Sequence, residues 1–97
     1  MNIESLRMLE YLILLYIHTH DEVKMISLRE HFVRDYKYYT IRRAIYKLNA
    51  DKHYIKLTLR SVISNGKCTA TYSCYTLTEK GKETLDVFNS LIQAASQ

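Results

Sequence analysis

Hydrophobic residues change their spacing around residues 51–53, and this change limits the folds that the chain can adopt. One side of residues 40–52 is apolar at the spacing of an α-helix. That side comprises Ile41, Ala44, Ile45 and Leu48. Over residues 55–60, apolar and polar residues instead alternate, which is typical of a half-buried strand. The sequence therefore predicts a helix followed directly by a strand, and a fold of the α+β class.

A β-hairpin and a last helix are predicted after this point. Asn65 and Gly66 form the dipeptide that most strongly indicates a two-residue hairpin turn. Residues 68–77 are rich in Thr and Tyr and predict the return strand. Thr78 can cap a helix over residues 79–94. The apolar stripe of that helix is Leu85, Phe88, Leu91 and Ile92.

The first helix is predicted over residues 3–18, followed by a loop over residues 18–22. Its apolar residues fall on two adjacent stripes, so it should be buried on more than one side. Such a helix either forms the centre of a monomeric core or meets a second subunit, and in so small a domain we favour the second subunit. The stripes are Leu6, Leu9, Ile13 and Tyr16 or Ile17, and Met8, Leu12 and Leu15.

Two further helices complete the expected order. Ser27 and Glu30 have the spacing of a capping box, which predicts a short helix over residues 28–34. A tight turn over residues 35–39 then leads into the basic helix, which ends near Ala50. Two short helices joined by a turn, the second basic, are typical of a helix-turn-helix. The predicted fold is a winged helix-turn-helix, in which the hairpin is the wing. The residues expected to point inward from the short helix are Leu28 and Phe32.

Positive charge is concentrated in the middle of the chain. Residues 24–60 contain ten Lys and Arg against three acidic residues, a net charge of +7. Residues 1–23 carry −3 and residues 61–97 are neutral, which gives the total of +4. A localised basic region indicates a surface for an anionic partner. The alternative is an ordinary solvated helix face.

The polar side of the basic helix carries side chains that bind nucleic acid. Arg42, Arg43 and Tyr46 are candidates for base edges, because the first and central turns of such a helix lie deepest in the major groove. Lys37, Tyr39 and Lys47 are candidates for phosphate, helped by the amide groups at the start of the helix. Arg60 and Lys67 flank the wing and are candidates for the backbone or minor groove, although Lys67 can equally protect an edge strand. The candidate DNA-binding residues are Lys37, Tyr38, Tyr39, Thr40, Arg42, Arg43, Tyr46, Lys47, Arg60 and Lys67.

Two segments resemble a known group of proteins. Residues 35–55, D-Y-K-Y-Y-T-I-R-R-A-I-Y-K-L-N-A-D-K-H-Y-I, resemble the recognition-helix segment of winged-helix regulators. Residues 75–85, Y-T-L-T-E-K-G-K-E-T-L, resemble the junction between the wing and the last helix in the MarR and PadR groups. The resemblance implies a homodimer held by the first and last helices, with each basic helix in a major groove.

The length and the Tyr- and Ile-rich composition are also similar to those of small winged-helix proteins of archaeal viruses and plasmids. A cytoplasmic protein is therefore expected, in the cytoplasm of the host cell if the chain is viral. MarR relatives usually have additional helices around a ligand pocket. Because this chain is short, we do not expect a small-molecule effector.

Other classes of protein are not expected. At 97 residues the chain is predicted to be a single domain over residues 1–97. It contains no dinucleotide, P-loop, nucleophile-elbow or zincin motif, so neither an enzyme nor a cofactor is expected. Only His18 and His20 have a paired spacing, which does not make a zinc site. Residues 11–17 are too short to span a membrane and lack the flanks of a signal peptide, so an intracellular protein is expected.

Cys68 and Cys74 are separated by an even number of positions, so they should face the same side of one strand about 20 Å apart. At that distance they cannot bond to each other. We expect small buried apolar residues, with an intersubunit disulfide as the alternative.

Together these patterns predict a dimeric, sequence-specific protein that binds double-stranded DNA and regulates transcription. A winged-helix module that binds other proteins in a transcription or replication assembly is the alternative. Binding of structured RNA is a third possibility.

Overall fold

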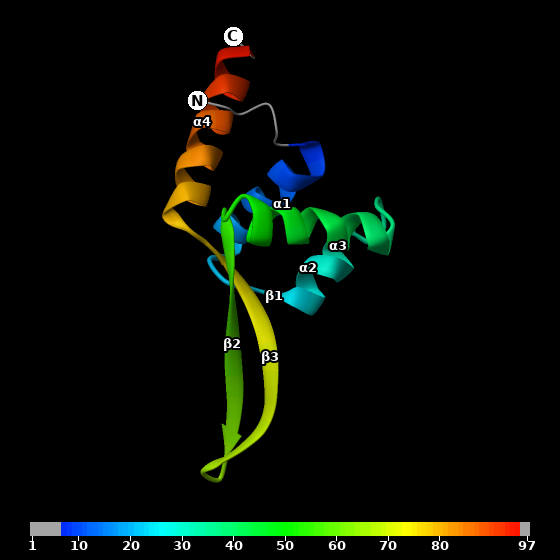
Figure 1. Ribbon diagram of the computed structural model, residues 1–97, viewed down its shortest axis with the longest axis vertical. Coiled ribbons are helices and arrows are strands. Elements are labelled where there is room, and N and C mark those ends of the chain that lie inside the picture. The colour runs from blue at the N-terminus through cyan, green and yellow to red at the C-terminus, as the bar shows by residue number, and fades with distance from the viewer. Residues whose placement is uncertain (1–6, 96–97) are drawn as a thin grey trace.

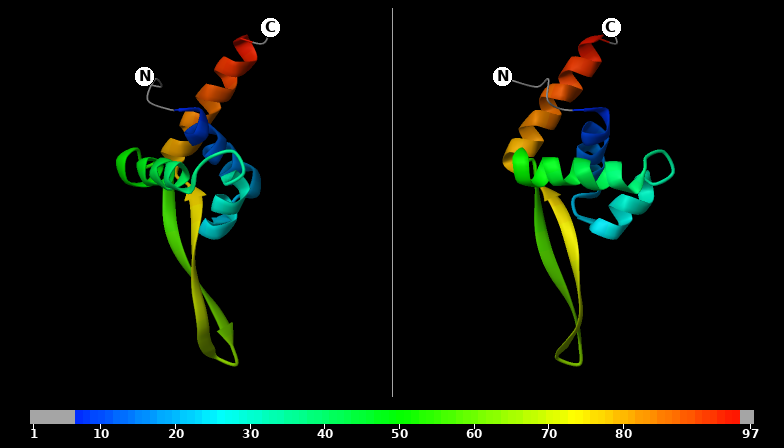
Figure 2. Two further views of the ribbon diagram at one scale, coloured as in Figure 1. Left: turned by 90° about the vertical axis from the view of Figure 1, so that its right-hand side faces the viewer. Right: turned by 45° about the vertical axis from the view of Figure 1, so that its right-hand side comes forward.

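The computed structural model describes residues 7–95, which form a helical body and a long β-hairpin. Their elements are α1 (Met8–His20), β1 (Val23–Lys24), α2 (Met25–Phe32), α3 (Tyr38–Tyr46), the π-helical turn η1 (Lys47–Asp51), β2 (Ile55–Ser64), β3 (Lys67–Leu77) and α4 (Glu79–Ala95). The strands form an antiparallel sheet in the order β1-β3-β2. The helices gather at one end, and the β2–β3 hairpin, here called the wing, extends away from them (Figures 1 and 2). The predicted α+β class is confirmed, while β1 and η1 are additions to the expected order.

Helices α1, α2 and α3 enclose the core together with the base of the sheet. Burial of each large apolar side chain contributes about 1.5–3 kcal/mol. The apolar face predicted for α3 is confirmed, because all four of its residues are buried. The fully buried side chains include Ile13, Leu14, Ile17, Leu28, Ile41, Leu48, Ile55 and Leu85.

Helix α1 runs to His20, two residues further than predicted. Thr19 donates its hydroxyl to a carbonyl of the preceding turn at 2.8 Å, and the ring of His20 stacks on Tyr16 with centroids 4.3 Å apart. These contacts keep the last turn helical, so the expected loop begins only at Asp21, which has a positive φ of 62°. Residues 3–6 of the predicted helix lie outside the described residues.

The predicted capping box of Ser27 and Glu30 is wrong. Helix α2 already begins at Met25, and the residue before it, Lys24, has an extended backbone with φ −65° and ψ 142°. The cause is tertiary: Lys24 pairs with β3, and the chain passes from that short strand directly into the helix. The inward positions are buried as predicted: Leu28 and Phe32.

The turn before the basic helix is shorter than predicted, because α3 begins at Tyr38 rather than after residue 39. Helix α3 continues without a break into η1, which ends at Asp51, one residue beyond the predicted end. In this last turn the Lys52 amide donates to the Lys47 carbonyl, five residues back, at 2.9 Å. The turn is therefore wider than an α-helical one.

The wing has the predicted turn at its tip. Asn65 and Gly66 have φ of 54° and 78°, both positive as a type I′ turn requires. Every residue from 61 to 71 is exposed. At the base of the wing Ile55 is buried, whereas Leu59 is 70% exposed. The alternation in β2 therefore predicts a strand correctly but does not mark a buried face along its length.

The prediction that Cys68 and Cys74 face the same side is wrong. The pairing register shifts between Val62 and Ile63, so that Cys68 lies opposite Ile63 and Cys74 opposite Thr58. Because side chains alternate along β2, Ile63 and Thr58 lie on opposite faces, and so do the two cysteines. Cys68 is exposed, contrary to expectation, and Cys74 is buried as expected.

Helix α4 begins at a close contact with the segment before β2. The amide of Gly81 donates to the Thr78 hydroxyl at 3.0 Å, which confirms the predicted cap. That hydroxyl donates to the His53 carbonyl at 2.6 Å. A Cβ atom added to Gly81 would lie 2.0 Å from the carbonyl oxygen of Tyr54. Glycine therefore allows α4 to approach this segment, which the sequence alone did not show.

Candidate nucleic-acid interface

The exposed face of α3 and η1 carries two adjacent stripes of side chains. Successive helical residues are about 100° apart, so Arg42 and Arg43 point in different directions. Tyr39 and Tyr46 lie between them and are 70% and 63% exposed. The α1 stripe consists of Tyr39, Thr40, Arg43 and Lys47, which line a cavity shared with α1. The α2 stripe consists of Tyr38, Arg42, Tyr46 and Asn49, which line a cavity shared with α2 and β3.

The cavity beside the α1 stripe has a volume of about 150 Å³. Arg7 and Glu10 line it from the start of α1, opposite Arg43 and Lys47. It therefore gathers three cationic side chains and one carboxylate. Because hydroxyl groups of Tyr39 and Thr40 also belong to its lining residues, the cavity is rich in groups that can donate to an anion.

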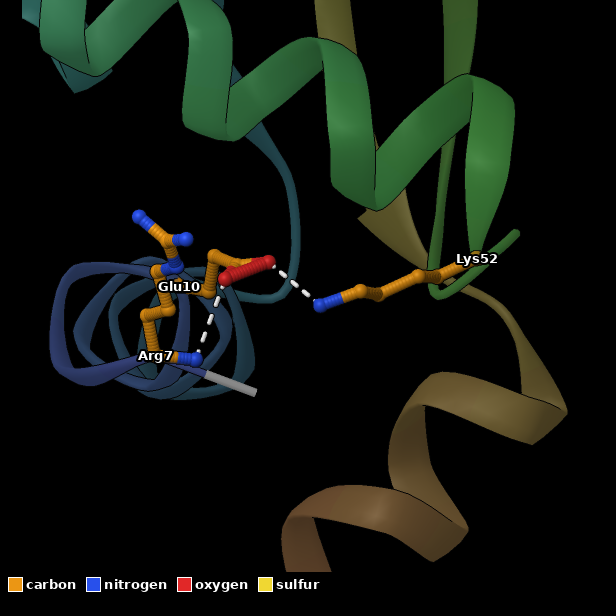
Figure 3. A network of polar contacts seen from close by, with 3 residues as sticks. All are labelled: Arg7, Glu10 and Lys52. Carbon is orange, nitrogen blue, oxygen red and sulfur yellow. Dashed lines mark hydrogen bonds and ion pairs between the residues drawn. The ribbon is translucent and has the colours of Figure 1, made fainter. Parts of the chain in front are cut away.

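The carboxylate of Glu10 is already engaged by other groups. Glu10 is buried, forms an ion pair with the Lys52 ammonium and accepts a hydrogen bond from the Arg7 amide at 3.0 Å. The close-up view shows both contacts, and it shows the Arg7 guanidinium directed away from Lys52, toward α3 (Figure 3). Glu10 thus links the start of α1 to the end of η1. Lys52, which the charge count placed in the basic region, belongs to this internal network.

The cavity beside the α2 stripe is larger, about 220 Å³, and more of its lining is aromatic or aliphatic. Arg29 of α2 stacks its guanidinium over the Tyr38 ring, 4.3 Å from the centroid. The Nε atom of Arg29 is buried without a hydrogen-bond partner in the described part of the chain. Arg42 and Asn49 line the same cavity. This side of α3 thus combines planar side chains with donors that suit base edges.

The predicted cations divide into available and engaged groups. Within residues 7–95, no acidic side chain forms an ion pair with Lys37, Arg42, Arg43 or Lys47. Arg60, by contrast, pairs with Glu22 at 2.8 Å at the base of the wing. The hydrogen bond and the charge of Glu22 raise the pKa of Arg60 further above its ordinary value. Apart from Lys67 on the wing, the cations of the predicted site that form no ion pair within the described residues therefore lie on α3 or directly beside it, whereas Arg60 is paired with Glu22.

Besides Arg60, the wing has two exposed cationic side chains, Lys56 near its base and Lys67 at its tip. Lys67 is exposed beside the turn at the tip. Most of the other exposed side chains of the wing are apolar or hydroxylic. The exposed apolar side chains of β2 are Leu57, Leu59, Val62 and Ile63.

Two residues of this surface, Arg7 and Arg29, were not predicted, and Asn49 was expected on the polar side of the basic helix without an assigned contact. Asn49 lies on the polar side of the basic helix, so the helical pattern was sufficient to find it. Arg7 and Arg29 come from α1 and α2, and no spacing in the sequence indicates that these helices bring them beside α3. In residues 7–95, no group of three metal-binding side chains occurs, and no helix is long and apolar enough to cross a membrane.

Helices α2 and α3 followed by a β-hairpin define the winged-helix class of fold. No protein-family model matches the chain, and no match is found among curated proteins. Among solved structures, the chain is similar to Bacillus subtilis PadR in a crystal structure with operator DNA, with a TM-score of 0.60 and 27% sequence identity. The match covers 84% of this chain and 46% of the PadR chain, so the chain spans about half the length of that protein.

Proposed function

We propose that this chain is a DNA-binding transcriptional regulator that places α3 in the major groove of double-stranded DNA. The observation that carries the proposal is structural similarity to PadR bound to its operator, at 27% identity, together with the cations that α3 leaves without internal partners. No catalytic function is proposed. The candidate residues on α3 supply the contacts, with Lys67 of the wing reaching the backbone or minor groove.

We also propose that the chain acts as a homodimer held by α1 and α4. Helix α4 buries Leu85 near its start, but Leu91 in its last turns is 48% exposed. On α1, Met8 is exposed and Leu12 and Leu15 are only partly buried. Apolar side chains thus remain accessible on both helices, where a second copy would cover them. Two copies of α3 in such a dimer would address half-sites about 34 Å apart.

Selection of bound duplexes from a random pool tests both proposals together. We expect a palindromic consensus, because a two-fold symmetric dimer binds two equivalent half-sites. Titration of the selected duplex at two salt concentrations should show a steep loss of affinity with salt, since phosphate binding releases counterions. Absent or salt-independent binding would contradict the proposed function. A preference for structured RNA in the same titration would also contradict it.

Arg42→Ala is the sharpest single variant for base recognition. Arg42 lies on the α2 stripe and has no internal ion pair in the described residues, so its loss should cost about 1–3 kcal/mol of specific binding and relax the preference at one base position. Lys82→Ala, on the exposed side of α4, is a control of equal charge change. An Arg42→Ala variant that weakens selected and random duplexes equally would show that this residue does not read bases.

A second candidate function is a module that binds other proteins. The observation that favours it is the exposed apolar surface of the wing, where Leu59 and Ile63 are 70% and 68% exposed. Apolar surface of this kind is typical of protein interfaces. Leu59→Ser combined with Ile63→Ser should leave duplex affinity unchanged if the wing binds a protein rather than DNA.

A further inference from the structure

We propose that Arg7 joins Arg43 and Lys47 in a clamp that binds one DNA phosphate between α1 and α3. This inference rests on the proposed DNA binding and adds to it a residue from outside the helix-turn-helix. The sequence had predicted that Arg43 contacts a base edge. The clamp instead assigns Arg43 to the DNA backbone.

The α1 stripe brings its donors to one side of the helix. Tyr39, Arg43 and Lys47 follow one another at intervals of four residues, so they lie one above the other on consecutive turns. All three line the cavity of about 150 Å³ that Arg7 lines from α1. A cavity needs about 10–15 Å³ on the same measure to hold one water, so there is room for a phosphate group among these donors.

The charge of this cavity suits a phosphate. Its lining includes the cationic side chains of Arg7, Arg43 and Lys47 and a single carboxylate, that of Glu10. Glu10 does not neutralise them, because one of its oxygens pairs with Lys52 and the other accepts the Arg7 amide. Arginine presents a planar fork of donors that matches phosphate geometry, and two arginines with a lysine are sufficient to surround one anion.

Glu10 is the positioning residue of the clamp. Its contact with Arg7 is made through the backbone amide, which fixes the first turn of α1 and leaves the guanidinium available. Figure 3 shows that guanidinium directed toward α3, on the side opposite to Lys52. The network of Glu10 and Lys52 therefore holds Arg7 beside the α1 stripe and leaves the Arg7 guanidinium available for a phosphate.

With the clamp in place, the two stripes have different roles: the α1 stripe binds phosphate and the α2 stripe contacts bases. A phosphate held on the α1 stripe fixes the rotation of the helix about its own axis relative to the groove. The α2 stripe, with Arg42 and Asn49, is then the side that faces base edges. Phosphate contacts set the register in which base contacts become possible, although they carry no sequence information themselves.

Arg7→Ala in the full chain tests the clamp, with the selected duplex and a random duplex as ligands. We expect both affinities to fall by the same factor, about tenfold, because one charge-assisted contact is lost from each site. The slope of log K against log salt should become shallower by about 0.9 for each clamp. Arg7→Lys should keep that slope, since the charge is retained. Lys82→Ala is the control and should bind like the wild type.

Replacing single phosphates of the selected duplex with neutral methylphosphonate locates the contact. One position in each half-site should weaken wild-type binding but have no effect on Arg7→Ala, whose contact is already missing. The Arg7→Ala replacement removes only an exposed side chain of the protein, and thermal unfolding should confirm an unchanged fold. If Arg7→Ala binds like Lys82→Ala, or if no position distinguishes it from the wild type, the clamp is overturned while the proposed function stands. If the wild type binds no duplex at all, both proposals fall.

Discussion

The helical body and the wing contain the same kinds of apolar residue in opposite surroundings. Leu48 at the end of the basic helix is fully buried, whereas Leu59 in the wing is 70% exposed. Both were found from local spacing, one at the helical period and the other at the period of a strand. The body gives its apolar side chains a second layer, because α1, α2 and α3 pack on one another. The wing projects beyond that layer (Figure 2).

This difference shows that the requirements for forming a strand or helix are separate from the requirements for burying its apolar side chains. Alternation and a favourable turn are sufficient to specify a hairpin, and the wing has both. Burial additionally requires an opposing surface, which the wing lacks from residue 61 to residue 71. The body should therefore hold most of the folding free energy, and the wing should be available for a ligand.

The largest difference in the free energy of unfolding should be seen between two separate variants, Leu48→Ala in the body and Leu59→Ala in the wing. Leu48→Ala creates a cavity in a packed core and should lower the free energy of unfolding by about 3 kcal/mol. Leu59→Ala removes an exposed side chain and should change it by less than about 0.5 kcal/mol. Urea denaturation of both variants measures the two values. Similar losses in the two variants would mean that the wing is covered in solution, for instance by a second copy.

The next comparison is between Gly81, at the start of α4 in the body, and Gly66, at the tip of the wing. Gly81→Ala would force a Cβ against the Tyr54 carbonyl, and the backbone on both sides must shift, so we expect a loss of about 3 kcal/mol. Gly66→Ala meets no atom within 4 Å but has a positive φ of 78°. It should cost about 1 kcal/mol, from backbone strain alone. Thermal unfolding of the two variants compares steric conflict with strain. A tolerated Gly81→Ala would show that α4 does not need this close approach.

The sequence was sufficient to predict elements whose signals are local. The hairpin at Asn65 and Gly66, the cap at Thr78 and the inward face of α3 depend on neighbours within a few positions. The start of α2 was mistaken because Lys24 pairs with a strand fifty residues away, and that pairing overrode the local signal of Ser27. Likewise the two cysteines were placed on one face because a shift of register cannot be read from parity alone.

The candidate site shows the same division. Helical spacing predicted the cations of α3 but could not separate those that are free from those that are engaged. Lys52 and Arg60 contributed to the count of positive charge, yet their partners are Glu10 and Glu22, each about forty residues away in the chain. Arg7 was missed for the same reason, since its place beside α3 depends on how α1 packs.

Breaking the ion pairs of Glu10 and Glu22 gives a further comparison, because the first pair lies in the body and the second at the base of the wing. Glu10→Gln removes the buried carboxylate of the ion pair with Lys52 and should cost about 2 kcal/mol, because breaking a buried ion pair is destabilising. Glu22→Gln breaks an exposed pair at the base of the wing and should leave the free energy of unfolding unchanged. It releases Arg60, so duplex affinity should rise and its salt dependence should steepen if Arg60 can reach DNA. Unchanged binding by Glu22→Gln would remove Arg60 from the interface.

The smallest effect concerns pH and the residues where the wing joins the body. Burial raises the pKa of Tyr75 above its ordinary value, and burial likewise raises the pKa of Cys74. In the unfolded chain these groups lose their protons at ordinary values, about 8.5 for cysteine and 10 for tyrosine, while the folded chain still retains them. The folded state then binds more protons, so stability is fully present below about pH 8 and falls as the pH rises beyond these values.

Tyr75→Phe should make that alkaline fall shallower, since the phenylalanine ring keeps the packing and has no proton to lose. Tyr46→Phe, at an exposed position of α3, serves as the matched control and should follow the wild-type curve. Urea midpoints measured between pH 7 and pH 11 compare the three proteins. Identical curves for Tyr75→Phe and the wild type would mean that the base of the wing opens to water before the body unfolds, so that the boundary between the two regions lies closer to the core than the static structure places it.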